Sequence, residues 1–251
     1  MISDDFNLRG KSAVVTGDSR YWAKYAAGVL AEAGADVAIV AGNTTKLEEA
    51  AQAVHRHGTN ALTIPADTVD AFQVKDAVQQ VVSEFGRIDI LVNAADLEFA
   101  KPLMETTEGE WRRVLDANLT SAFHCCQAVG RRMIEQKKGR IINLISCLAE
   151  RGVANCGAYC AAMGGILQLT RTLDVEWAPY GITTNAVGTV WMSETEKTGG
   201  PQEELLLKYV PLKRYGHPSE MGALLVYLAS DTTDFFSGQF LYADGAAMSH
   251  L

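Results

Sequence analysis

Short runs of apolar, β-branched residues alternate along the chain with longer segments whose apolar residues recur at helical spacing. The short runs predict seven strands, over Ser12–Thr16, Asp36–Ala41, Ala61–Pro65, Ile88–Val92, Arg140–Ile145, Ile182–Val187 and Gln239–Ala243. Since a helical segment separates each strand from the next, the pattern predicts one parallel sheet with helices on both of its faces.

The helical segments are equally regular. Between the first two strands, apolar residues recur at helical spacing from Trp22 to Ala33, and Gly34 stands where a helix would end. Further helices are predicted over Thr45–His57, Ala71–Phe85, Thr107–Gln136, Gly157–Pro179 and Pro218–Ser230. No linker, low-complexity tract or internal repeat interrupts this alternation. We therefore predict an α/β fold: one Rossmann-like, doubly wound domain over residues 1–251 with a seven-stranded parallel sheet.

Charge and composition narrow the class of protein. The chain has 22 Lys and Arg against 30 Asp and Glu, a net charge of −8, and no basic run that would bind a nucleic-acid backbone. The first residues, MISDDFNLRGKS, contain no apolar core of a signal peptide. No uncharged apolar stretch approaches the roughly 18–20 residues that span a bilayer. We expect a cytoplasmic protein that binds neither nucleic acid nor membrane.

The cysteines and histidines give no sign of a metal. The five cysteines lie in apolar segments without Cys-x-x-Cys spacing, which favours buried, reduced thiols. His55 and His57 are two residues apart in a predicted helix and so point to different sides of it. We predict no metal site.

Candidate chemistry gathers where predicted strands end. In a doubly wound sheet, ligands bind at the carboxyl ends of the strands, near the point where the strand order reverses. The segments at that edge are Thr16–Ala23, Asn93–Asp96, Ser146 with Tyr159 thirteen residues later, and Asn185–Val190. A ligand site is expected among them.

At these residues the sequence resembles the short-chain dehydrogenase/reductase superfamily, and the resemblance extends from Leu8–Lys11 to Asp244–Gly245. Members of that family bind NAD(H) or NADP(H) and move a hydride to or from an alcohol or ketone. They use an Asn, a Ser, a Tyr, and a Lys four residues after the Tyr. The resemblance implies that Asn118, Ser146 and Tyr159 stand in the first three roles.

The fourth role is not matched, because the Lys position is Met163. In the family the ammonium favours the phenolate form of the Tyr and hydrogen-bonds the nicotinamide ribose, whereas a thioether carries neither charge nor donor. Without a cation, a Tyr with a pKa of about 10 is phenolate in only about one molecule in a thousand at pH 7. We expect proton transfer at Tyr159 to be severely impaired.

The family's cofactor positions are altered as well. Its glycine-rich turn is Thr-Gly-x-x-x-Gly-x-Gly, and here Tyr21 and Ala23 replace the second and third glycines, which places a phenol ring where a diphosphate would lie. Ala41 and Gly42 stand where an acidic or basic residue would select NAD or NADP, and Asp96 replaces the glycine of the Asn-Asn-Ala-Gly segment.

Three positions still match cofactor contacts of the family, namely Gly17, Asp67 and Asn93. The altered cofactor positions outnumber these three matches. We expect this chain to bind no dinucleotide.

Three hypotheses of function remain open. The first is a non-catalytic subunit that forms a heterotetramer with an active, NAD-binding paralogue, using the small-residue run Tyr159–Gly165 and the long helix before it, where the family forms its interfaces. The second is a nicotinamide-free, lyase- or dehalogenase-like enzyme in which Ser146 and Tyr159 polarise a substrate oxygen and Asp96 is the base. The third is a sensor that binds a small ligand in the altered cleft.

Overall fold

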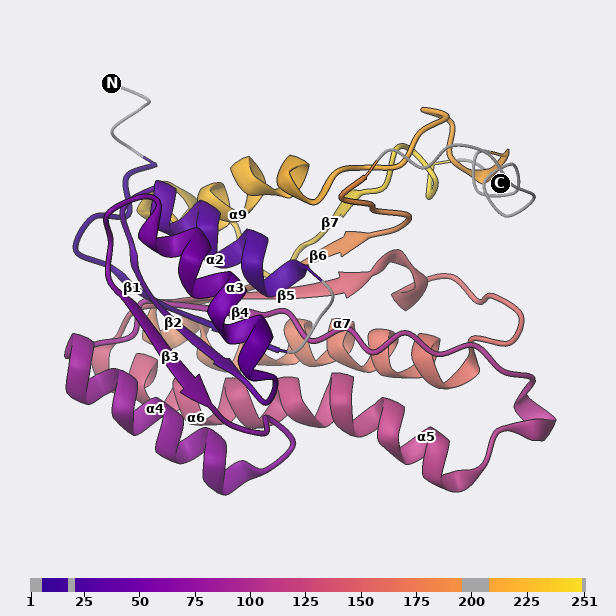
Figure 1. Cartoon of the computed structure of the whole chain (residues 1–251), viewed down its shortest axis with the longest axis horizontal. Helices are drawn as coiled ribbons and strands as arrows, with labels where there is room; N and C mark the ends of the chain where they lie inside the picture. The colour runs from indigo at the N-terminus through magenta and orange to yellow at the C-terminus, as the bar shows by residue number, and fades with distance from the viewer. Residues whose placement is uncertain (1–5, 18–20, 196–207, 250–251) are drawn as a thin grey trace.

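The fold is a seven-stranded parallel sheet between two layers of helices (Figure 1). The computed structural model describes residues 6–17, 21–195 and 208–249. The sheet has the order β3-β2-β1-β4-β5-β6-β7, and every neighbouring pair is parallel. Its strands are β1 (Ser12–Thr16), β2 (Asp36–Ala41), β3 (Ala61–Pro65), β4 (Ile90–Asn93), β5 (Gly139–Ser146), β6 (Ile182–Thr189) and β7 (Phe240–Ala243). The predicted fold class is confirmed.

One helical layer consists of α2 (Trp22–Glu32), α3 (Thr44–His55) and α9 (Gly222–Ala229). The opposite face is covered by α4 (Ala71–Phe85), α6 (Ser121–Gln136) and α7 (Gly157–Trp177), with α5 (Glu108–Leu115) leading into α6 (Figure 1). No helix in the described part of the chain is long and apolar enough to cross a membrane.

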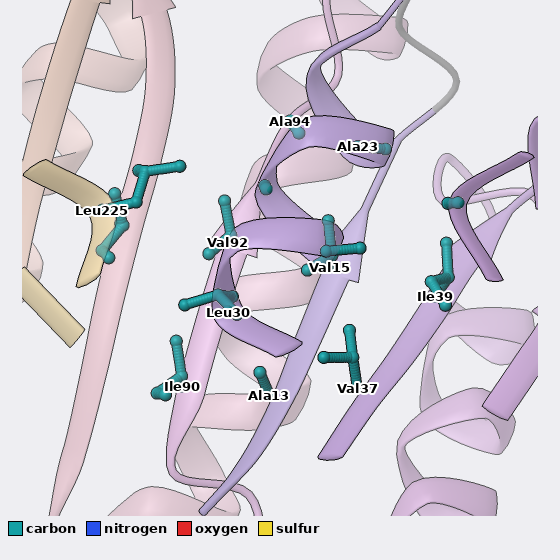
Figure 2. Close-up of a cluster of buried hydrophobic side chains, with 14 of the residues drawn as sticks. Ala13, Val15, Ala23, Leu30, Val37, Ile39, Ile90, Val92, Ala94 and Leu225 are labelled. Carbon is teal, nitrogen blue, oxygen red and sulfur yellow. The ribbon is translucent and has the colours of Figure 1, made fainter. Parts of the chain in front are cut away.

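The core divides between the two faces because successive side chains of a strand point to opposite sides. On the α2 and α9 side, Figure 2 shows Leu30 and Leu225 packed over alternate residues of the central strands. Those strand residues are Ala13, Val15, Val37, Ile39, Ile90 and Val92, all at most 1% exposed. This rigid centre fixes where the strands end.

A chain of buried polar side chains ties the centre of the sheet to α7. The Thr16 hydroxyl donates to Asn93 Oδ1 (3.0 Å), Asn93 Nδ2 donates to Asn143 Oδ1 (2.8 Å), and Asn143 Nδ2 donates to Thr170 Oγ1 (2.9 Å). Each of these bonds satisfies a group whose burial without a partner would cost about 1–3 kcal/mol. We refer to these four residues as the polar ladder.

The strand order reverses between β1 and β4. The segments that follow these two strands lie close together. Gly17, directly after β1, has φ +114°, and a Cβ there would lie 2.4 Å from the backbone nitrogen of Ala95. Only glycine permits this approach. The close contact of the two strand ends creates the crevice in which a doubly wound sheet binds its ligand.

Candidate functional site

A cleft of about 720 Å³ opens at the carboxyl ends of the central strands. Its walls come from the residues that follow β1, β4, β5 and β6, and from the start of α7. This is the edge of the sheet at which the sequence predicted a ligand site. Tyr21, Asp96, Ser146 and Tyr159 all line it.

Asp96 is the centre of the hydrogen bonding in the cleft. The Tyr159 hydroxyl donates to Asp96 Oδ1 at 2.6 Å, and Trp22 Nε1 lies 3.4 Å from Asp96 Oδ2 as a weaker donor. The three side chains come from α7, from the loop after β4 and from the first residue of α2. They join elements far apart in the sequence across the mouth of the crevice.

The electrostatics of this group hold Tyr159 in its neutral form. Burial raises the pKa of Tyr159 strongly, and the neighbouring Asp96 carboxylate raises it further by repulsion and by accepting the phenol proton in a hydrogen bond. Burial also raises the pKa of Asp96, from 3.8 to about 6, although the Tyr159 hydrogen bond opposes the rise. At neutral pH the pair is therefore a phenol bonded to a carboxylate.

Met163 does not reach into the cleft. Its side chain is fully buried in the cluster that contains Ile145 and Tyr159, and its sulfur accepts a hydrogen bond from the Ser146 backbone nitrogen at 3.3 Å. The Ser146 hydroxyl accepts from the Leu148 nitrogen at 3.1 Å. The position of the family's Lys thus offers neither a cation nor a donor to a ligand.

Asn118 lies in a π-helical segment, Asp116–Thr120, between α5 and α6. Its side chain is buried, accepts from the Leu97 nitrogen at 2.9 Å and donates to the Leu97 carbonyl at 3.1 Å and the Val114 carbonyl at 2.9 Å. Asn118 therefore fixes the segment that carries Asp96.

The three positions that match cofactor contacts of the family, Gly17, Asp67 and Asn93, have different surroundings. Gly17 is at the crevice, but Asn93 is in the polar ladder rather than in the cleft wall. Asp67 is exposed after β3, where its carboxylate accepts from the Val69 nitrogen of its own loop at 2.9 Å. The role of these three residues as cofactor contacts stays a prediction.

Comparison with known proteins places this geometry in a family. A family model described as enoyl-(acyl carrier protein) reductase matches residues 22–246. The chain is 36% identical over 238 residues to the 3-oxoacyl-(acyl-carrier-protein) reductase of Staphylococcus epidermidis, covering 94% of this chain and 98% of the relative. A short-chain type dehydrogenase/reductase from Mycobacterium marinum matches with a TM-score of 0.92 and 30% identity over 100% of both chains. The chain belongs to the short-chain dehydrogenase/reductase superfamily of oxidoreductases.

Another solved relative in this superfamily is the gluconate 5-dehydrogenase of Burkholderia cenocepacia, in complex with NADP and tartrate. Its TM-score to this chain is 0.92, at 31% identity over 100% of both chains.

The described residues of the cleft do not match what such a dinucleotide needs. Tyr21 stands at the start of α2 with its ring 4.6 Å from that of Trp22 and its hydroxyl 3.4 Å from the Met192 carbonyl after β6. These rings occupy the approach to the helix terminus, where a superfamily member would place the pyrophosphate. Asp96 adds a negative charge beside them.

The end of β2, where the family binds the adenosine ribose, carries Ala41 and Gly42. Ala41 is buried at the end of β2, and the adjacent Gly42 offers no side chain to a ribose or a 2′-phosphate. Neither Ala41 nor Gly42 thus carries a charged side chain that could distinguish NAD from NADP.

Several residues of the cleft lie outside the segments predicted from the sequence, among them Glu98, Trp191 and Tyr215, whereas Trp22 lies inside one of those segments but was given no role there. Trp22 was assigned to the apolar face of its helix, and it is indeed only 6% exposed. Its position one residue after Tyr21, at the edge of the crevice, was the available signal. Glu98 had a similar signal, two residues after Asp96. Trp191 and Tyr215 reach the cleft only through loops after β6.

The small-residue run on α7 packs within the chain. A Cβ on Gly165 would lie 2.7 Å from Leu119, and one on Gly164 would lie 3.3 Å from the Ala149 carbonyl. These two glycines permit close packing against neighbouring segments of the same molecule. The assembly role expected of the whole run, Tyr159–Gly165, stays a prediction.

Among the described residues, no group of three or more His, Cys, Asp or Glu side chains could hold a metal ion. Cys125, Cys126 and Cys147 are buried free thiols, as predicted, but Cys156 and Cys160 are only partly buried. Cys156 reaches the cleft wall because it directly precedes α7.

Proposed function

We propose that this chain is a non-catalytic subunit that assembles with an active, NAD-binding paralogue of the same superfamily. The observation that carries the proposal is the pairing of Tyr159 with Asp96 where the superfamily has a Tyr and a Lys. A base for hydride-coupled proton transfer needs a Tyr with a lowered pKa. In this chain burial and Asp96 raise the pKa of Tyr159, and the Lys position holds the buried Met163.

We further propose that this chain binds no dinucleotide and that the partner subunit binds NAD. It is supported by Tyr21 and Asp96 beside the crevice and by Ala41 and Gly42 at the end of β2. A superfamily fold with these substitutions retains its surfaces for assembly, since the substitutions lie at one edge of the sheet. Assembly into a heterotetramer with the active subunit is the function that this geometry leaves intact.

The class of reaction in the partner is proposed from resemblance. The pattern of substitutions resembles the inactive subunit of 2-(hydroxy(phenyl)methyl)succinyl-CoA dehydrogenase of anaerobic toluene degradation, in which an inactive chain pairs with an active, NAD-dependent one. On this basis the complex would oxidise the secondary alcohol of a hydroxyacyl-CoA to a ketone. Two exposed apolar side chains, Phe123 on α6 (43% exposed) and Val175 on α7 (77% exposed), are candidates for the surface that the partner covers.

The first experiment is a titration of the purified chain with NADH, followed by fluorescence and calorimetry. The same titration is made with the double variant Tyr21→Gly, Met163→Lys. The natural chain is expected not to bind, while micromolar binding would refute the cofactor part of the proposal. The double variant shows whether these two positions alone exclude the dinucleotide.

The second experiment tests assembly. The chain is co-expressed with an NAD-dependent superfamily paralogue from the same genome, and the complex is analysed by size exclusion and native mass spectrometry. A stable mixed oligomer that oxidises a hydroxyacyl-CoA, with activity unaffected by Tyr159→Phe in this chain, is expected. Oxidation of that substrate with NAD by this chain alone would refute the proposal.

One observation favours a second candidate, the nicotinamide-free enzyme. Asp96 has a pKa of about 6, lines an open cleft and is held by the Tyr159 hydroxyl, which is an arrangement suited to a general base. Such an enzyme would eliminate or hydrolyse without a hydride acceptor. Turnover by the chain alone that is abolished by both Asp96→Asn and Tyr159→Phe would establish this function in place of the first.

A further inference from the structure

The wall of the cleft is rich in aromatic side chains. Six aromatic side chains line it, namely Tyr21, Trp22, Phe99, Tyr159, Trp191 and Tyr215. They come from both sides of the crevice: α2, the loop after β4, α7 and the loops after β6. The faces of such rings carry partial negative charge and attract cations.

The formal charges in the wall have the same sign. Asp96 and Glu98 both line the cleft, and none of the lining residues that the structure describes is Lys, Arg or His. Glu98 is close enough to raise the pKa of both Asp96 and Tyr159 by repulsion. The two carboxylates therefore act on the same volume, and an anion entering it would be repelled by both.

Asp96 is oriented but not saturated. It accepts from Tyr159 on one oxygen and from Trp22 on the other. An ionised carboxylate has about four acceptor positions, so each oxygen can take a further interaction from a ligand. The two donors hold the carboxylate in place, which lowers the cost of ordering it when a ligand binds.

We propose that this cleft binds a small organic cation, an ammonium group on an apolar or aromatic frame. The positive group would lie against Asp96 with aromatic rings around it, and Glu98 at the entrance would favour its entry. Charge and ring faces, rather than hydrogen-bond donors of the protein, would give the site its selectivity. The proposal does not depend on whether the chain has a partner subunit, because the described part of the cleft is built from this chain alone.

A matched pair of probes tests the charge requirement. Choline carries a quaternary ammonium, and 3,3-dimethylbutan-1-ol has nearly the same shape without the charge. Binding to the full chain is measured by calorimetry and by the fluorescence of the cleft tryptophans. We expect choline to bind saturably, the neutral alcohol to bind at least about tenfold more weakly, and the choline affinity to fall as salt is added.

Substitutions locate the binding. Asp96→Asn keeps the shape of the side chain and is expected to weaken choline binding by about tenfold or more, because it removes the central charge. Glu98→Gln, at an exposed position where unfolding is not a concern, is expected to weaken it by about two- to threefold. The control, Asp76→Asn on the exposed side of α4, is expected to bind choline as the natural chain does.

Three results would overturn the proposal: no saturable binding of choline, equal affinity for the neutral alcohol, or unchanged affinity in both cleft variants. The proposed subunit function is tested separately by assembly with the paralogue. Failure of one proposal therefore leaves the other intact.

Discussion

The carboxyl group of Asp96 is expected to destabilise the folded protein at neutral pH. Its pKa rises from 3.8 in an unperturbed Asp to about 6, chiefly because burial disfavours the charged form. Each pKa unit corresponds to about 1.4 kcal/mol, so ionised Asp96 lowers the free energy of unfolding at pH 7 by up to about 3 kcal/mol. Asp96→Asn removes the charge and keeps an oxygen that can accept from Tyr159.

The direction of the pKa shift determines the pH range in which Asp96 changes the stability of the protein. Between about pH 4 and pH 6 the folded state binds more protons at Asp96 than the unfolded state does, so this residue makes stability fall as pH rises through that window. Below about pH 4 the residue is protonated in both states and its contribution disappears. The advantage of Asp96→Asn should therefore be near zero at pH 4 and reach about 2–3 kcal/mol at pH 7.

Urea denaturation at half-unit steps of pH, followed by far-UV circular dichroism, measures this difference. At each pH, the free energy of unfolding of the natural chain is subtracted from that of the variant, which cancels the contributions of all other titrating groups. Asp76→Asn on α4 removes an exposed carboxylate of the same kind and should show no comparable rise. A difference between Asp96→Asn and the natural chain that is flat across pH 4–7, or one that favours the natural chain at pH 7, would refute the electrostatic reasoning.

Further predictions concern other features of the fold and site. Tyr159→Phe removes a donor from Asp96 and should raise the pKa of that carboxyl above 6, as seen by carbon NMR titration. Gly17→Ala should cost about 2–4 kcal/mol of stability in urea denaturation, because its Cβ would lie 2.4 Å from a backbone nitrogen at φ +114°. Met163→Lys alone should lower stability by about 2–4 kcal/mol, more at pH 6 than at pH 9, because its ammonium would enter a fully buried site. Arg140→Met should cost about 2–4 kcal/mol, because this 3% exposed guanidinium bonds two backbone carbonyls and an aspartate.

The last three of these variants have matched controls. Gly109→Ala in α5 meets no atom within 4 Å and should be neutral or stabilising. Met163→Leu keeps volume and neutrality and should cost less than about 1.5 kcal/mol. Lys138→Met removes a partly exposed partner of Asp231 and should cost at most about 1 kcal/mol. Equal losses in a variant and its control would point to general disruption instead of the stated cause.

Strand positions were predictable because the central strands are buried on both faces and all seven are short apolar runs bounded by turns. The first three agree with the structure residue for residue. The fourth covers Ile90–Asn93 rather than Ile88–Val92, and the buried Asp89 before it accepts from the Ser12 nitrogen with its carboxylate. The fifth and sixth extend beyond the prediction to Ser146 and Thr189, polar residues whose burial a hydrophobic pattern does not reveal.

The prediction of one continuous helix over Thr107–Gln136 was wrong. The π-helical segment Asp116–Thr120 divides it into α5 and α6. Two local side-chain bonds accompany the break: Asn118 donates to the Val114 carbonyl, and the Ser121 hydroxyl donates to the Ala117 carbonyl. Such bonds compete with the backbone ladder, but whether they distort a helix depends on tertiary partners, here Leu97. Sequence spacing alone does not supply that partner.

The polar ladder and the hydrogen bonds of Asp96 form separate networks. Thr16, Asn93, Asn143 and Thr170 satisfy one another between the sheet and α7, and none of these bonds involves Asp96. Substitutions in the cleft therefore leave these buried bonds, and the stability that depends on them, untouched. Substitutions in the cleft act on a different quantity, the free energy cost of ionised Asp96 at neutral pH, which burial sets and which the neutral side chain of Met163 does not reduce.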